Sequence, residues 1–104
     1  MPYHSAMNMQ DITAAMRERM GDDSGLNATV KFDCGIDGVI YLDGRAQPNR
    51  VDNEDRPADC TVTITHANLL ALINKELDPA MGFMMGRFKI TGDMSVALKL
   101  QKVL

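Results

Sequence analysis

The stretch that decides the fold runs from residue 59 to residue 100 and reads DCTVTITHANLLALINKELDPAMGFMMGRFKITGDMSVALKL. It opens with an alternation of apolar residues and threonines through Cys60, Val62 and Ile64, the period-two pattern of a half-buried strand. Thr65 follows, and its hydroxyl can accept hydrogen bonds from the free amides of a first helical turn. We therefore predict a strand over 59–65 and a leucine-rich helix that begins at about His66.

The same stretch then alternates helix and strand signals. Asp78-Pro79 supplies a cap and a first-turn proline, so a second short helix should begin there and end at Gly86. Arg87 to Thr91 has the alternation of a last strand. Asp93 can cap a terminal helix.

In the first half of the chain, the spacing of apolar residues predicts an amphipathic helix from Ala6 to Met20. Alternation predicts a strand over Ala28–Cys34, and Asp37-Gly38 predicts a tight hairpin turn to a return strand over Val39–Asp43. The stretch Gly44–Pro57 resembles a surface loop with at most one poor edge strand. This order predicts an α+β fold with one mostly antiparallel sheet.

Length and charge exclude several classes of protein. A chain of 104 residues with 45% hydrophobic and 24% charged residues fits one globular domain, here residues 1–104. The net charge of −3 gives no basic footprint for phosphate backbones, so we expect no nucleic acid partner. Apolar runs are far shorter than the roughly 20 residues of a membrane span.

The chain start, Met1 to Gln10, has neither a basic segment nor a continuous apolar stretch, so no secretory signal is expected. Two cysteines cannot form a disulfide framework, and Cys34 and Cys60 both fall on inward strand positions. Burial raises a thiol pKa, so we interpret both as structural residues of a cytoplasmic protein.

Motifs for catalysis are missing from the sequence. It contains no Gly-x-Ser-x-Gly elbow, phosphate loop or dinucleotide fingerprint, and its cysteines lack the spacing of metal ligands. An enzyme would need an unrecognised site around His66 or Asp59, and a solvent-exposed helix position is the simpler interpretation of His66. We expect no catalytic residue, no metal and no cofactor.

Methionines and charges are unevenly distributed. Five of the nine methionines lie in the first 20 residues and four lie between Met81 and Met94. Their flexible side chains suit either ordinary core filling or an adaptable apolar surface. Residues 80–104 contain four basic residues and one acidic residue. The basic side chains could bind an anionic head group or simply complement a helix dipole. The four are Arg87, Lys89, Lys99 and Lys102.

Two segments carry a resemblance to a known family. The strand 58–64 with its leucine-rich helix, and the run 86–94 with Ala97-Leu98-Lys99-Leu100, resemble the sterol carrier protein type 2 family. The match extends from the first helix to Leu104 and is poor over 44–57. It implies a five-stranded sheet covered by helices, enclosing a hydrophobic tunnel. In this family the tunnel holds fatty acids, fatty acyl-CoA, sterols or other lipids without catalysis.

The resemblance also implies which residues line the tunnel. They come from the two middle helices, the last strand and the terminal helix: Leu69, Ile73, Leu77, Met81, Phe83, Met84, Met85, Phe88, Ile90, Met94, Leu98 and Gln101. The peroxisomal members end in a tripeptide of the Ser-Lys-Leu type, from which Lys102-Val103-Leu104 departs. A peroxisomal address is therefore not predicted.

Two functions remain open at this point. The first is a carrier that takes the apolar tail of a lipid or fatty acyl ligand into the tunnel. A dry tunnel of ~300 Å³ would cost about 7 kcal/mol, so flexible methionines, water or ligand should occupy it. The second is an interaction module whose Met-rich helices form a dimer or partner interface.

The sequence leaves the oligomeric state open, a monomer included. It also leaves open a transient contact with a membrane surface. The first helix could make that contact through Met9, Ile12, Met16 and Met20, although burial of these residues against the sheet is the favoured interpretation.

Overall fold

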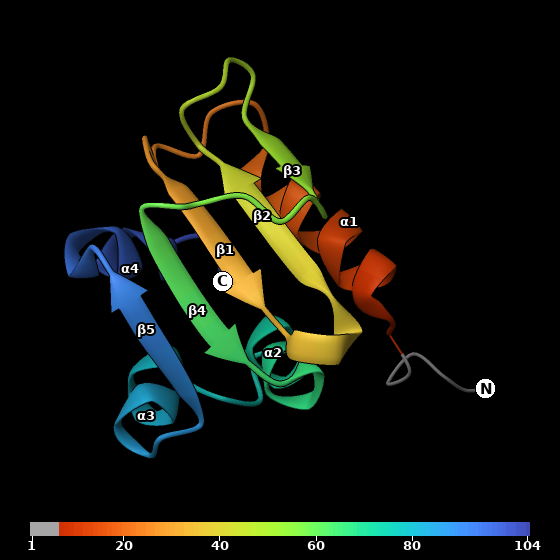
Figure 1. Cartoon of the computed structure of the whole chain (residues 1–104), viewed down its shortest axis with the longest axis vertical. Helices are drawn as coiled ribbons and strands as arrows, with labels where there is room; N and C mark the ends of the chain where they lie inside the picture. The colour runs from red at the N-terminus through yellow and green to blue at the C-terminus, as the bar shows by residue number, and fades with distance from the viewer. Residues whose placement is uncertain (1–6) are drawn as a thin grey trace.

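The computed structural model describes residues 7–104, and its elements follow the predicted order. They are α1 (Met9–Met20), β1 (Thr29–Asp33), the 3-10 turn η2 (Gly35–Asp37), β2 (Val39–Asp43), β3 (Arg50–Asp52), β4 (Cys60–Ile64), α2 (His66–Ile73), α3 (Pro79–Met84), β5 (Phe88–Gly92) and α4 (Met94–Leu100). The strands form one sheet in the order β3-β2-β1-β4-β5 (Figure 1). Only β1 and β4 pair in parallel, so the predicted α+β fold with a mostly antiparallel sheet is confirmed.

The sheet has one apolar and one polar face. Across the strands Phe32 lies opposite Ile40 and Val62, and Val62 lies opposite Ile90, so these side chains share a face. The helices cover that face. The other face carries Lys31 and Tyr41, and the segment from β3 to β4 crosses it (Figure 1). An apolar cavity is therefore expected between the helices and the apolar face.

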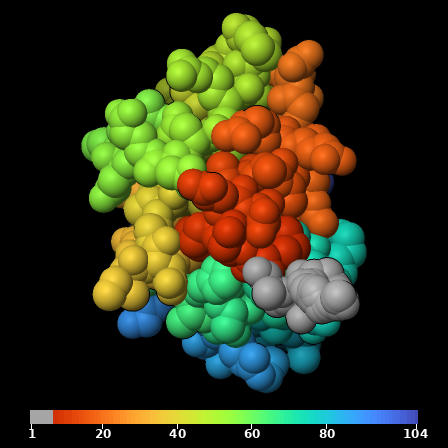
Figure 2. Space-filling model, turned by 90° about the vertical axis from the view of Figure 1, so that its right-hand side faces the viewer, coloured from red at the N-terminus to blue at the C-terminus, as the bar shows by residue number. Residues whose placement is uncertain are grey.

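Helix α1 covers the β3 side of the sheet. Asn8 caps it by accepting from the Asp11 amide, and Asp11 returns the bond to the Asn8 amide. Ile12, Met16 and Met20 are buried, and the helix packs against β3 and α2 (Figure 2). The predicted burial is confirmed for these three residues, whereas Met9, the fourth of the predicted stripe, is half-buried. Ala6, the predicted first residue, lies outside the described part of the chain.

Two local predictions are wrong. The hairpin between β1 and β2 is not a two-residue Asp37-Gly38 turn, because the 3-10 turn intervenes and the Cys34 amide donates to the Gly38 carbonyl at 2.9 Å. His66 is not simply solvent-exposed: it is half-buried, and its Nε2 donates to the Met7 carbonyl at 2.9 Å. The edge strand suspected within 44–57 exists as β3.

Both cysteines are buried and free, as expected. Burial, with Asp37 and Asp33 nearby, raises the pKa of the Cys34 thiol to about 11. Burial also raises the pKa of Cys60. Neither thiol is a nucleophile at neutral pH.

Asp59 fastens the start of β4 to the start of β1. Its carboxylate accepts from the Thr29 amide at 3.0 Å and from Arg45 at 2.9 Å, and its own amide donates to the Thr29 hydroxyl at 2.9 Å. The bond from the Thr29 amide is the largest of the effects that lower the Asp59 pKa. Asp59, which the sequence left open as part of an enzyme site, therefore has a structural role: it connects β4 to β1.

Asp59 also receives the end of β5. Its carbonyl oxygen accepts from the Asp93 amide at 2.9 Å, and a Cβ at Gly92 would lie 2.4 Å from that oxygen. Gly92 has a φ of +100°, which L side chains rarely adopt. Only glycine lets β5 approach β4 here before the chain turns into α4.

We predict that Gly92→Ala lowers the free energy of unfolding by about 2–4 kcal/mol, from combined backbone strain and steric overlap. Gly25→Ala is the matched control, because Gly25 also has a positive φ, +76°, but has no atom within 4 Å of a built Cβ. Its loss should be only about 1 kcal/mol. Urea titration measures both, and equal losses would show that the close approach at Gly92 does not matter.

Candidate functional site

Three capping residues set the helices that surround the site. Thr65 accepts from the Asn68 amide and starts α2, and Asp78 accepts from the Met81 amide and starts α3. Asp93 accepts from the Ser95 amide and hydroxyl, bonds that lower the Asp93 pKa, and starts α4. Each cap was predicted from the sequence. Together they fix where the two short helices begin beside β5.

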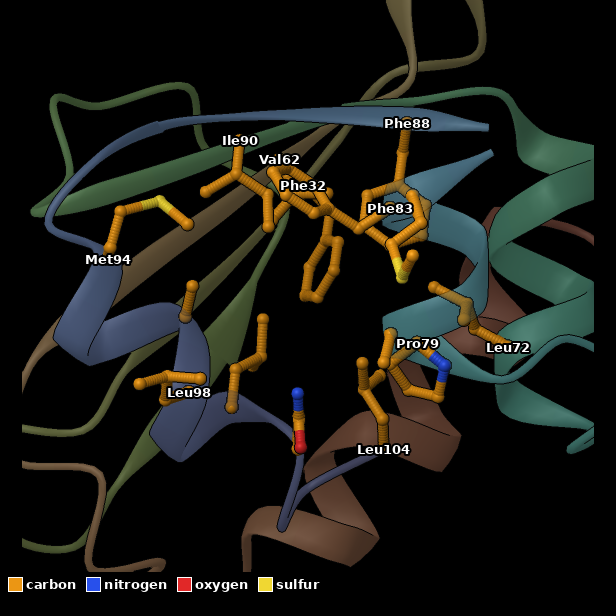
Figure 3. Close-up of a pocket in the computed structure, with 15 residues that line it drawn as sticks. Phe32, Val62, Leu72, Pro79, Phe83, Phe88, Ile90, Met94, Leu98 and Leu104 are labelled. Atoms are coloured by element: carbon orange, nitrogen blue, oxygen red, sulfur yellow. The ribbon is translucent and has the colours of Figure 1, made fainter. Parts of the chain in front are cut away.

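An apolar cavity of about 260 Å³ lies between α3, α4 and the sheet. Figure 3 shows Phe32, Val62 and Ile90 on the sheet side, Met94 and Leu98 on α4, and Pro79 and Leu104 opposite. Fifteen residues line it: Phe32, Val62, Leu72, Pro79, Ala80, Phe83, Met84, Phe88, Ile90, Met94, Ala97, Leu98, Leu100, Gln101 and Leu104. None of these side chains is titratable.

The wall at α3 depends on a glycine. A Cβ at Gly82 would lie 2.7 Å from Cε2 of Phe88, so only glycine lets α3 sit this close to the ring without displacing it. The neighbouring Phe83 ring lies 6.3 Å from the Phe88 ring, centroid to centroid, at an interplanar angle of 42°. Such tilted pairs are favourable for aromatic side chains. Gly82 thus has a packing role at the cavity wall.

The structure brings seven of the predicted tunnel residues to this cavity: Phe83, Met84, Phe88, Ile90, Met94, Leu98 and Gln101. The other five lie outside the lining. Leu69 and Ile73 are buried in the main core, and Leu77 lines an adjacent hollow. Met81 and Met85 are exposed near the cavity rather than inside it. That the seven contact a ligand remains a prediction.

Sequence reasoning missed eight lining residues: Phe32, Val62, Leu72, Pro79, Ala80, Ala97, Leu100 and Leu104. Alternation did place Phe32 and Val62 on the inward face of their strands. It did not distinguish an inward residue that meets a helix from one that meets the cavity. One signal pointed to the lining residues near the end of the chain: the terminal helix has more apolar residues than one packed face needs.

Apolar side chains surround the mouth of the cavity. Met84 is 81% exposed and Leu98 67%, and Phe83 and Met94 are also exposed. These four residues, which we call the rim, also line the cavity. The methionines therefore border the opening and do not fill it. The four cations of the last quarter, Arg87, Lys89, Lys99 and Lys102, do not line the cavity.

Within residues 7–104 no helix has the length and apolar character to cross a bilayer. The same described residues contain no cluster of three or more His, Cys, Asp or Glu side chains suited to a metal ion.

Comparison with known proteins now decides the family. Residues 10–104 match the model of the SCP-2 sterol transfer family. The chain belongs to this family. The resemblance noted in the sequence is thereby confirmed.

Named relatives of this SCP-2 family member are much longer proteins. Sterol carrier protein 2 of Oryctolagus cuniculus is 47% identical over 51 residues, which are 49% of this chain and 9% of that protein. Stomatin-like protein 1 of Mus musculus is 38% identical over 72 residues, 67% of this chain and 18% of that protein. The chain therefore spans a small part of the length of these relatives.

Solved structures share the fold. Sterol carrier protein 2 from Yarrowia lipolytica, in its apo form, has a TM-score of 0.74 at 20% identity, covering 89% of this chain and 86% of that chain. Palmitated SCP2L2 from Aedes aegypti has a TM-score of 0.70 at 22% identity, covering 93% and 94%. At such low identities the likeness establishes the fold alone.

The exposed methionines give a direct test of the site geometry. We predict that dilute hydrogen peroxide oxidises Met81, Met84, Met85 and Met94 well before Met16 and Met20, which are at most 2% exposed. Peptide mass spectrometry over time measures each sulfoxide. Comparable early oxidation of Met16 or Met20 would contradict the placement of α1 on the core.

Proposed function

We propose that this chain is a non-catalytic lipid-binding and carrier protein. It holds the apolar part of a fatty acid, fatty acyl-CoA, sterol or similar lipid in the cavity between α3, α4 and the sheet. The observation that carries the proposal is the lining itself, where fourteen of fifteen side chains are apolar. Membership of the SCP-2 sterol transfer family and the palmitated structural neighbour support it.

The cavity also favours this function over a protein interaction module. A dimer interface needs an apolar surface that a partner can cover, whereas an apolar hollow behind that surface adds nothing to such an interface. Apolar ligands, in contrast, gain most of their affinity from burial in a concave site. The absence of titratable side chains from the lining supports binding without catalysis.

We propose further that the whole chain, 1–104, acts as one such domain in the cytoplasm. The two buried free thiols fit a reducing compartment, and cell fractionation checks the location.

Filling the cavity should prevent binding. We predict that Ala97→Phe, whose new ring would occupy space beside Leu98 and Leu100, weakens binding of a fluorescent fatty acid and a fluorescent sterol by at least about tenfold. Displacing two methylene groups of ligand loses about 1.6 kcal/mol, which exceeds a tenfold change in Kd. Fluorescence titration measures the affinity.

The matched control is Ala14→Phe, on the exposed side of α1. It should bind both probes like the unaltered protein. Circular dichroism and the Tm of each variant show that the fold is kept. Unchanged probe affinity in a folded Ala97→Phe protein would overturn the proposed site.

The rim suggests how a lipid enters. We propose that the rim rests transiently on a membrane surface while a lipid moves into the cavity, since Met84 and Leu98 can enter the interface and nearby lysines meet anionic head groups. Met84→Asp should reduce co-flotation with phosphatidylglycerol-containing vesicles. Undiminished flotation of that variant would contradict rim contact, with Met9→Asp on α1 as the comparison for contact through the first helix.

A further inference from the structure

We infer that the bound lipid carries an uncharged, hydrogen-bonding head group, such as a hydroxyl, and that Gln101 is the residue that receives it. This inference rests on the proposed function and deepens it. Gln101 is the single polar side chain among the fifteen that line the apolar cavity. A lipid with its tail against Phe32 and Val62 can make a side-chain hydrogen bond with the lining at that residue alone.

The position of Gln101 gives the ligand a direction. A second hollow, of about 340 Å³, lies beside the apolar cavity and shares four of its lining residues: Leu72, Pro79, Gln101 and Leu104. The second hollow adds Lys75, Leu77 and Asp78. Gln101 thus stands between an apolar space and a polar one. An amphiphile fits this arrangement with its tail toward the sheet and its head toward Gln101.

Charges around the second hollow disfavour an anionic head group. It is lined by one cation, Lys75, and one anion, Asp78. The Lys75 Nζ already donates to the backbone oxygen of Leu104 at 3.0 Å. The Asp78 carboxylate is committed to the Met81 amide at the start of α3, and it would repel a carboxylate nearby. The charges of Lys75 and Asp78 offset each other, so the hollow offers an ionised head group no net attraction.

The carboxamide chemistry of Gln101 favours a hydroxyl. A glutamine side chain offers an acceptor oxygen and two N–H donors, and a hydroxyl can both donate and accept. The two groups therefore match in both directions. A carboxylate only accepts, so it can use the N–H donors but is repelled by the amide oxygen. The other basic residues of the last quarter, Arg87, Lys89, Lys99 and Lys102, do not line either space.

The test compares two ligands with one tail: 1-dodecanol and dodecanoate, at pH 8, where the acid is ionised. We expect the unaltered protein to bind dodecanol more tightly. Gln101→Leu should weaken dodecanol binding about three- to tenfold, the effect of one lost hydrogen bond. Gln101→Lys should reverse the preference toward dodecanoate. Isothermal titration calorimetry gives each Kd, and Gln10→Leu on the exposed side of α1 is the matched control.

The possible outcomes distinguish a failure of the head-group inference from a failure of the proposed lipid-binding function. If both ligands bind but dodecanoate binds as well as dodecanol, or Gln101→Leu leaves dodecanol affinity unchanged, the neutral head group is wrong and the lipid site stands. If Lys75→Gln is what weakens dodecanoate, the head group is anionic and lies at Lys75. If neither ligand nor a fluorescent sterol binds, the proposed function itself falls.

Discussion

The structure depends on a mismatch between the apolar face of the sheet and the helices available to cover it. Helix α1, 12 residues long, packs on the β3 side and against α2, and its side chains Ile12, Met16 and Met20 are buried there. Over β4 and β5 the cover comes mainly from α3 and α4, of 6 and 7 residues, with Leu72 of α2 at its border. Two short helices cannot fill the space that a longer one would fill. The cavity lies where the apolar sheet continues and the helical cover falls short.

The same mismatch explains the exposed apolar side chains. An empty, dry cavity of about 260 Å³ would cost roughly 6 kcal/mol, a large share of the ~5–15 kcal/mol by which a typical domain is stable. Closing the hole with larger side chains would remove that cost and also the binding space. Met84 and Leu98 instead lie exposed at the mouth of the cavity. Stability and the proposed lipid binding thus compete at this end of the molecule.

Features that depend on contacts between residues close in the sequence could be predicted, whereas features that depend on distant contacts could not. Caps such as Thr65, Asp78 and Asp93 act within three residues, so a local pattern was sufficient to predict where α2, α3 and α4 begin. Strand alternation likewise gave the inward faces. The prediction of an Asp37-Gly38 turn failed because the turn begins earlier in the chain: the 3-10 turn spans Gly35–Asp37, and the Cys34 amide donates to the Gly38 carbonyl. Membership of the cavity could not be predicted residue by residue, since Leu69 and Leu72 lie one helical turn apart yet only Leu72 reaches it.

Two glycines position the short helices that border the cavity. Gly92 allows β5 to lie against the Asp59 carbonyl, and the chain can then turn at Asp93 into α4. Gly82 allows α3 to lie against Phe88. Each brings one short helix to a fixed place beside β5, so the distance between α3 and α4, and with it the width of the cavity, is set by two positions that have no side chain. The apolar residues determine what the cavity accepts, while these glycines determine that there is a cavity of this shape between the two helices.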